Sequence, residues 1–225
     1  MLHDQLILLF VKAPQRGQVK SRLAAILGQD SALELYRSFV LDILIAIETS
    51  GFPCRICYHP PDSGEALKDW LGDQRQYMPQ EGNDIGERME KAFRRAFSEG
   101  ITRAVLIGSD IPDLPPAMFA RAFRSLDDHG AVIGPALDGG YYLIGFNKDT
   151  FFPGVFSGIA WSTGDVFSRT MQTFDHAGQR VEQLPLWRDM DTVEDLKDLV
   201  VRNRNSGSRA GRTMNCLSFL MNGLV

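Results

Sequence analysis

The stretch LILLFVKAPQRGQVKSRL, residues 6–23, decides the fold class. Its first six residues are uniformly apolar, which is typical of a parallel β-strand that is covered on both faces. The polar and basic segment that follows predicts a turn at the carboxyl end of this strand, leading into a helix. Because ligands in open α/β sheets bind beyond the carboxyl ends of strands, this turn is the first candidate binding segment.

Strand-like and helix-like segments alternate along the rest of the chain. Residues 31–49 carry apolar side chains at three- and four-residue steps, the spacing of one helix face. Apolar or β-branched runs predict further strands at 54–58, 76–78, 104–108, 131–134, 141–146 and 181–186. Helices are expected at 65–71, 85–98, 115–126, 166–177 and 192–202. This alternation predicts an α/β fold with a mainly parallel sheet between two helical layers.

We expect a single domain over residues 1–202, since no repeat or linker is recognisable before its end. Residues 203–212 are polar, basic and rich in Gly and Ser, as flexible linkers are. Residues 215–225 are apolar again but too few to cross a bilayer, so we expect them to dock on the core or to mediate a contact. We therefore separate residues 203–225 as a C-terminal tail of undefined structure.

Composition argues against several functional classes. The 225 residues include 24 Lys and Arg against 28 Asp and Glu, a net charge of -4, so the chain lacks the basic field that holds nucleic acid. Three cysteines are too few for a disulfide framework, and the pair Cys54 and Cys57 lies in a strand-like context rather than at a helix start. The apolar run at 6–11 is too short for a transmembrane segment. We expect a cytoplasmic protein, with its scattered histidines on the surface or in loops.

Four cations crowd the turn after the first strand: Lys12, Arg16, Lys20 and Arg22. Guanidinium groups offer paired donors to phosphate, and ammonium groups act as mobile point charges. Gly17 lets the backbone approach a ligand closely, and the helix start that follows favours anions. A solvated basic loop has the same composition, but the position after the first strand favours phosphate binding.

Acidic residues follow two other predicted strands. Asp110 has no evident structural role, so it is a candidate ligand for Mg²⁺ or Mn²⁺, which bind carboxylate together with phosphate oxygens. Asp113 precedes a predicted helix and is assigned to capping first and to metal second. Asp191 or Thr192 can cap the last helix, and Asp191 is equally a second metal ligand.

Two further loops have the character of binding segments. Residues 137–142, LDGGYY, form a hairpin turn by default, yet paired glycines and tyrosines also suit a polar ligand close to the backbone. Residues 161–163, WST, offer a stacking face and hydroxyls, although Trp161 is also a plausible core or loop anchor. Residues 80–89, QEGNDIGERM, fit a base-recognition loop or a plain helix start in which Asp84 is the cap.

Six motifs in a fixed order resemble a known family: FVKAPxxGxVKxRL, QxGxDIGERM, VLIGSDIPDLP, GPAxDGGYYLIGF, WST and RDMDTxEDL. They are similar to bacterial proteins of the glycosyltransferase-A type that are assigned to arsenosugar biosynthesis or accompany radical-SAM enzymes. The family in turn resembles nucleotidyltransferases that make molybdopterin dinucleotides and activate phospholactate. The resemblance covers residues 5–201.

The resemblance implies a three-layer, Rossmann-like domain of the nucleotide-diphospho-sugar transferase type. It makes Asp110 the metal-binding aspartate and Asp191 a second ligand. The residues that it places against the nucleotide are Lys12, Arg16, Gly17, Lys20, Arg22 and, in the base loop, Asp84. The residues that it places around the sugar or acceptor are Asp138, Gly139, Gly140, Tyr141, Trp161 and Ser162.

Residues and resemblance together predict a transferase that uses a nucleotide-activated donor with Mg²⁺ or Mn²⁺. The first hypothesis is a glycosyltransferase that moves a sugar from a nucleotide-sugar to a small acceptor, with Asp138 or Asp191 as the general base. One alternative is a nucleotidyltransferase that couples an NTP to a phosphorylated small molecule and releases pyrophosphate. The other is a non-catalytic nucleotide-binding module. The base, the sugar, the acceptor and the oligomeric state stay open.

Overall fold

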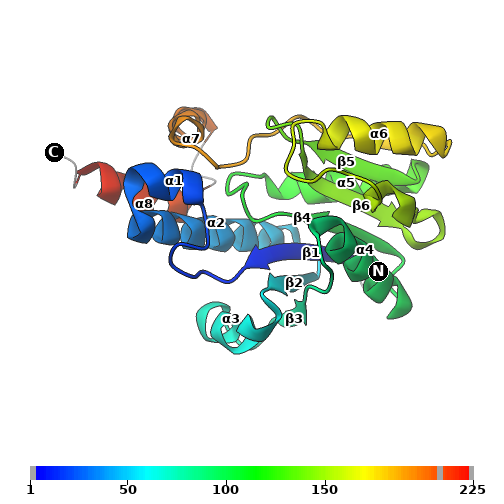
Figure 1. The fold of residues 1–225 in the computed structure, drawn as a ribbon, viewed down its shortest axis with the longest axis horizontal. Helices are drawn as coiled ribbons and strands as arrows, with labels where there is room; N and C mark the ends of the chain where they lie inside the picture. The colour runs from blue at the N-terminus through cyan, green and yellow to red at the C-terminus, as the bar shows by residue number, and fades with distance from the viewer. Residues whose placement is uncertain (1–3, 207–209, 223–225) are drawn as a thin grey trace.

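The computed structural model describes residues 4–206 and 210–222, and it contains a seven-stranded sheet between layers of helices (Figure 1). The strands are β1 (Gln5–Lys12), β2 (Cys54–His59), β3 (Gln76–Pro79), β4 (Arg103–Ile107), β5 (Ala131–Pro135), β6 (Tyr141–Asn147) and β7 (Val181–Gln183). The helices are α1 (Ser21–Leu27), α2 (Gln29–Ser50), α3 (Gly64–Leu71), α4 (Ile85–Ser98), α5 (Pro116–Asp128), α6 (Val166–His176), α7 (Val193–Ser206) and α8 (Gly211–Asn222). The predicted α/β fold with three layers is confirmed.

The order of the strands fixes where a ligand can bind. The sheet has the order β3-β2-β1-β4-β6-β5-β7, and β6 runs antiparallel to β4 and β5. From β1 the chain proceeds outward through β2 and β3, and it then returns to the other side of β1 to form β4. Such a reversal opens a crevice beyond the carboxyl ends of the two strands beside it. The segments after β1 and β4, which carry the basic turn and Asp110, therefore face one crevice.

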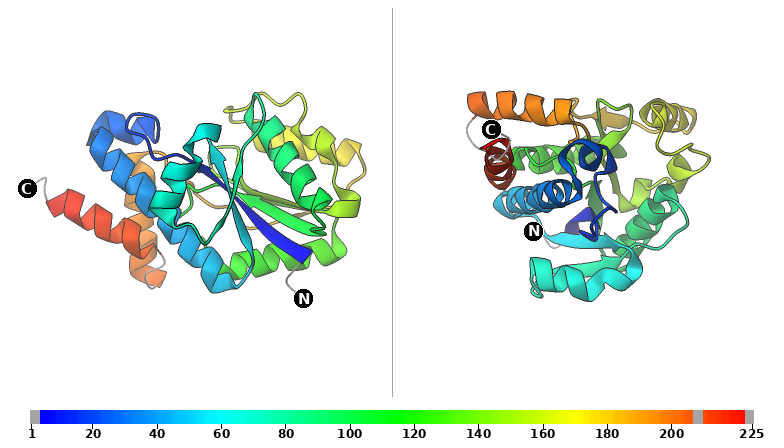
Figure 2. Two further views of the ribbon diagram at one scale, coloured as in Figure 1. Left: turned by 90° about the horizontal axis from the view of Figure 1, so that it is seen from below. Right: turned by 60° about the vertical axis from the view of Figure 1, so that its left-hand side comes forward.

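Strand β1 is buried on both faces, as its apolar run predicted. Ile7, Leu9 and Val11 pack with α2, α3 and α5, whereas Leu6, Leu8 and Phe10 pack with α4 and α6. Figure 2 shows these helices on opposite sides of the sheet. Each such side chain stabilises the fold by about 1.5–3 kcal/mol, so β1 is a rigid base for the turn that follows it.

The chain after the basic turn forms two helices, a division that the sequence pattern did not indicate. Helix α1 is a separate element, which Gly28 with a φ of 84° divides from α2. A glycine adopts this left-handed φ without the steric cost that other residues meet. The turn therefore feeds a short helix before the long one, and the residues of that short helix remain close to the crevice.

The C-terminal segment is helical on both sides of residues 207–209, which lie outside the described part, as do 223–225. Helix α7 continues past Arg202 to Ser206, with Asn203 buried and donating to the carbonyl of Leu199 at 3.2 Å. Helix α8 lies along α2 (Figure 2), and the buried Asp42 of α2 accepts hydrogen bonds from the first backbone N–H groups of α8. Burial raises the pKa of Asp42. Among the described residues, no helix is long and apolar enough to span a membrane.

Candidate functional site

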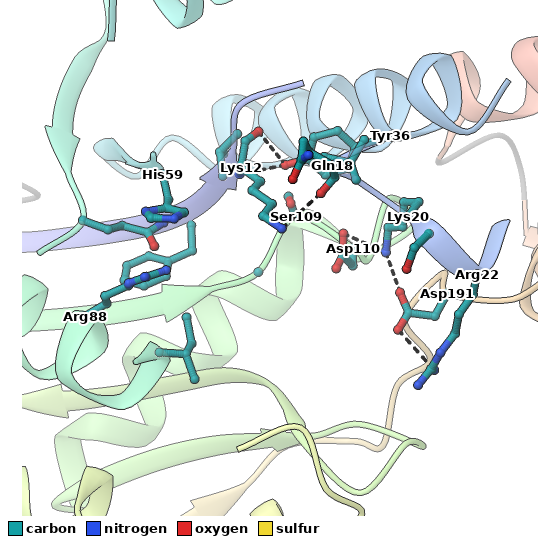
Figure 3. Close-up of a pocket in the computed structure, with 17 residues that line it drawn as sticks. Lys12, Gln18, Lys20, Arg22, Tyr36, His59, Arg88, Ser109, Asp110 and Asp191 are labelled. Atoms are coloured by element: carbon teal, nitrogen blue, oxygen red, sulfur yellow. Dashed lines mark hydrogen bonds and ion pairs between the residues drawn. The ribbon is translucent and has the colours of Figure 1, made fainter. Parts of the chain in front are cut away.

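Two adjoining pockets open at the carboxyl end of the sheet. The first, which we call the basic pocket, has a volume of about 430 Å³ and includes the cations Lys12, Lys20, Arg22 and Arg88 in its wall (Figure 3). The second, which we call the acidic pocket, has a volume of about 600 Å³ and is lined by β6, the 161–164 loop and the segment before α7. Four residues line both pockets: Arg22, Ile85, Asp110 and Asp191.

The basic turn is anchored through Lys12. Its backbone N–H donates to the hydroxyl of buried Tyr36 at 2.8 Å, and that hydroxyl donates to the Lys12 carbonyl at 2.9 Å. The Lys12 ammonium donates to the carbonyl of Gln18 at 3.1 Å, which closes the turn on itself. Gly17 has a φ of 76°, so the turn uses its conformational freedom. Helix α2 thus holds the turn in place at the edge of the basic pocket.

Lys20 brings the two predicted metal ligands together. Its ammonium lies 2.9 Å from Asp110 Oδ1 and 2.7 Å from Asp191 Oδ1, and its side chain is only 5% exposed. Burial opposes the charge on Lys20, but the two carboxylates outweigh this effect and raise its pKa. Arg22 lies 3.8 Å from the other oxygen of Asp191. Two acids from distant parts of the sequence therefore point at one position (Figure 3).

The local structure before α7 leaves the Asp191 carboxylate available to the site. Asp195 Oδ2 accepts hydrogen bonds from the backbone N–H of Asp191 and of Thr192, at 3.2 and 2.7 Å. Thr192 Oγ1 in turn accepts from the N–H of Asp195, so these two residues form the cap. The backbone N–H of Met190 donates to the carbonyl of Asp110 at 2.8 Å and ties the two acidic segments together.

Asp113 differs from its prediction as a helix cap. The residue before α5 is Pro115, and no side chain caps that helix. Asp113 is instead buried, where it accepts a hydrogen bond from the indole N–H of Trp187 at 3.0 Å and pairs with Arg202 at 3.4 Å. It holds the last part of the chain against the segment after β4.

Three of the predicted nucleotide-binding residues do not line the basic pocket. Arg16 is exposed and pairs with Asp30 of α2 through two contacts, at 2.6 and 3.1 Å. Gly17 shapes the turn without reaching the pocket wall. Asp84 accepts a hydrogen bond from the N–H of Glu87 at 2.8 Å and is the N-cap of α4. Lys12, Lys20 and Arg22 do line the pocket, and their contact with a nucleotide stays a prediction.

The pocket wall also contains residues that the sequence did not single out. His59 is next to Lys12 in the register of β1 and β2, and its buried Nδ1 has no hydrogen-bond partner among the described residues. Burial, followed by the charges of Arg88 and Lys12, lowers the pKa of His59. Since His59 is the last residue of a parallel strand, the rule that ligands bind at strand ends would have selected it.

Close backbone contacts shape the acidic pocket. The Asp138 carboxylate accepts from the N–H of Gly140 at 2.8 Å. Gly139, with a φ of 89°, lies so close to Gly164 that an added Cβ would be 2.0 Å from its carbonyl oxygen. Gly139 therefore does not line the pocket but holds the loop against the turn. The other predicted acceptor residues all line the pocket: Asp138, Gly140, Tyr141, Trp161 and Ser162.

Trp161 packs against the start of α4. An added Cβ on Gly86 would lie 2.5 Å from the Trp161 ring, so only glycine permits this contact. Ser162 has a φ of 66°, in the left-handed region that non-glycine residues seldom adopt. The loop is thus fixed by a tight aromatic contact and a strained residue, both at the pocket wall.

Asp189 is a fourth acid in the acidic pocket that the sequence did not single out as a site residue. Burial, followed by the charges of Asp138 and Asp191, raises its pKa to about 6. Within residues 4–206 and 210–222 no group of three or more His, Cys, Asp or Glu side chains is arranged to hold a metal. A cation between Asp110 and Asp191 would therefore need further oxygens from a ligand.

The raised pKa of Asp189 predicts a specific pH dependence of stability. The native state holds this proton more tightly than the unfolded chain does, so the stabilisation present at about pH 4 is lost as the pH rises through about 6. We expect the unfolding free energy of Asp189→Asn, relative to wild type, to rise between about pH 4 and pH 7. Urea unfolding in the presence of EDTA measures this, and a difference that is constant with pH would contradict it.

Several solved structures are similar to this chain. A search of curated proteins found no match. A solved structure provisionally named as a nucleotide-diphospho-sugar transferase, from Desulfovibrio desulfuricans G20, is 44% identical with a TM-score of 0.91 and covers 97% of each chain. CMP:2-keto-3-deoxy-manno-octonic acid synthetase complexed with CTP is 10% identical with a TM-score of 0.57, covering 89% of this chain and 99% of its own.

The manganese complex of Rv0371C from Mycobacterium tuberculosis H37Rv is 18% identical with a TM-score of 0.52, covering 88% of this chain and 98% of its own. At such low identity the last two structures show only that they share the fold of this chain. Residues 44–163 match a family model described as "Uncharacterized protein conserved in bacteria (DUF2064)". The chain therefore belongs to the DUF2064 family.

Proposed function

We propose that this protein is a metal-dependent glycosyltransferase. Its donor, a nucleotide-sugar, would bind in the basic pocket, and a small acceptor would bind in the acidic pocket. The observation that carries the proposal is that Arg22, Asp110 and Asp191 line both pockets. We call the place where the two pockets meet at these residues the junction. A diphosphate at this junction would present the bond to be broken to both pockets, which is what group transfer between two bound molecules requires.

A divalent cation fits the groups at the junction. The carboxylates of Asp110 and Asp191 approach one position within 3 Å, and hard cations such as Mg²⁺ and Mn²⁺ combine carboxylate with phosphate oxygens. When bound, the ion supplies charge neutralisation of the departing diphosphate. Lys12, Arg22 and Arg88 also line the basic pocket and would supply hydrogen-bond donors to the phosphate oxygens.

The charge of the acidic pocket favours sugar transfer over nucleotidyl transfer. Apart from Asp110 and Asp191, which the ion would neutralise, its described lining holds the carboxylates of Asp138 and Asp189 against the single cation Arg22. A phosphorylated acceptor would bring another anion beside these groups, at a cost of about 3 kcal/mol per pair at 5 Å in an effective dielectric of about 20. A neutral hydroxyl compound avoids this cost, and Asp138 or Asp189, which both line this pocket, would take its proton.

The second candidate is a nucleotidyltransferase. Its support is the shared fold with a synthetase that is complexed with CTP, together with the several cations of the basic pocket, which suit a triphosphate as well as a diphosphate. A non-catalytic nucleotide-binding module would need the basic pocket alone. The arsenosugar context of the sequence resemblance, the cytoplasmic location and the domain boundary at residue 202 stay predictions.

A panel of donors distinguishes the candidates. We expect Mn²⁺-dependent release of a nucleoside diphosphate from at least one nucleotide-sugar, measured by chromatography, with no pyrophosphate from any NTP. The reason is that the acidic pocket accepts a hydroxyl compound and disfavours a phosphorylated one. Pyrophosphate release from an NTP would overturn the assignment in favour of nucleotidyl transfer. Nucleotide binding without turnover over a broad acceptor set would favour the binding module.

A further inference from the structure

The Lys20 ammonium occupies an unusual position for a phosphate-binding lysine. It lies between Asp110 and Asp191 and, on its remaining side, 5.7 Å from the centre of the Phe39 ring. Its backbone has a φ of 49° and a ψ of 49°, a left-handed conformation that residues other than glycine rarely adopt. The surrounding contacts thus maintain both a strained backbone and a buried charge at one residue.

This position coincides with the one that a metal ion would need. An ion that bridges Asp110 Oδ1 and Asp191 Oδ1 would lie between the two oxygens that now contact Lys20, and Mg²⁺–oxygen distances are about 2.0–2.1 Å. An ammonium and a divalent cation cannot share that space, because they would repel one another at close contact. Binding of an ion between these two oxygens therefore requires the Lys20 side chain to move.

The pockets indicate where Lys20 can go. Lys20 lines the basic pocket but not the acidic pocket, whereas Asp110 and Asp191 line both pockets. Its ammonium lies beside Asp110 and Asp191 in the wall of the basic pocket (Figure 3). A nucleotide diphosphate in the basic pocket would offer it a new partner at a short distance.

We propose that Lys20 is an internal counter-cation, which holds Asp110 and Asp191 together before the donor binds and which transfers to the donor diphosphate when a metal ion takes its place. This inference rests on the proposed function. It implies that metal alone binds weakly, since the ion must expel a buried ammonium that then lacks a partner. Nucleotide supplies that partner, so metal and nucleotide bind cooperatively, each strengthening the other by the same factor.

Binding of Mn²⁺, followed by the electron paramagnetic resonance signal of the free ion, tests this proposal without any turnover. The proteins are wild type, Lys20→Met and a matched control, Lys148→Met, whose exposed side chain lies at the far end of β6. Each is titrated with Mn²⁺ alone and with Mn²⁺ in the presence of an equimolar mixture of UDP, GDP, CDP and ADP, because the base is not fixed. The same mixture without protein is the baseline, because the diphosphates themselves bind Mn²⁺. Circular dichroism verifies that each variant is folded.

We expect wild type and Lys148→Met to bind Mn²⁺ about tenfold or more tightly with the nucleotides than without them. Lys20→Met is expected to bind Mn²⁺ alone about tenfold more tightly than wild type, and to gain little from nucleotide. Equal or weaker binding of Mn²⁺ alone by Lys20→Met would overturn the proposal. If that variant does not fold, wild type decides: equal Mn²⁺ affinity with and without nucleotide overturns the proposal and leaves the proposed function standing. Absence of Mn²⁺ binding under both conditions would contradict the proposed function itself.

Discussion

The Asp110→Asn variant is expected to lower kcat/KM for transfer by about 10²–10³-fold, which is the range for loss of a group that stabilises transition-state charge. Asparagine keeps the shape of the side chain, and the Asp110 carbonyl still accepts from the N–H of Met190. The variant removes only the charge that a metal ion would share with Asp191. Initial rates with the best nucleotide-sugar, together with Mn²⁺-dependent nucleotide affinity, measure the effect.

Asp175→Asn is the matched control for this substitution. Asp175 is an exposed acid near the end of α6, and it lines neither pocket, so its loss changes the net charge equally without touching the junction. Wild-type rates are expected for the control. Unchanged metal-dependent affinity in Asp110→Asn would remove Asp110 from the site.

Gly139→Ala is expected to destabilise the fold by about 3 kcal/mol and to reduce transfer by about 10²-fold. An added Cβ would lie 2.0 Å from the carbonyl oxygen of Gly164, and the backbone there cannot move without releasing the loop that carries Trp161 and Ser162. The substitution therefore displaces the wall of the acidic pocket. Urea unfolding and acceptor-dependent rates measure the two effects.

Gly158→Ala separates the backbone clash from backbone strain. Gly158 also has a positive φ, 70°, and lies in the loop that carries Trp161 and Ser162, but an added Cβ would meet nothing within 4 Å. We expect this control to lose only about 1 kcal/mol, the ordinary cost of a left-handed non-glycine residue. Equal losses in the two variants would show that the contact between Gly139 and Gly164 contributes nothing beyond strain.

The sequence pattern was sufficient to predict the sheet and the crevice that its strand order creates. The apolar runs that became β1 and β4 are unambiguous because both are buried on two faces, and the strand-end rule then directs attention to Lys20 and Asp110. Asp191, which lies in a different part of the chain, pairs with Lys20 in the structure, and the acidic motif before α7 had made it a candidate.

What the pattern could not show was which charged groups are already paired. Arg16 looked equivalent to Lys20, but α2 places Asp30 beside Arg16 and withdraws it from the pocket. Asp113 looked like a cap, but folding brings Trp187 and Arg202 to it. Such pairings form between elements that are distant in the sequence. Local periodicity and motif spacing carry no information about them. The same limit hid the ion pairs that place Lys20 between two carboxylates.

The most direct measurement is a crystal structure of the protein with Mn²⁺ and the nucleoside diphosphate that binds most tightly, with manganese located by its anomalous signal. We predict one manganese peak in contact with carboxylate oxygens of Asp110 and Asp191 and with diphosphate oxygens, with the nucleotide in the basic pocket. A nucleotide bound elsewhere, or manganese that contacts neither aspartate, would contradict the account.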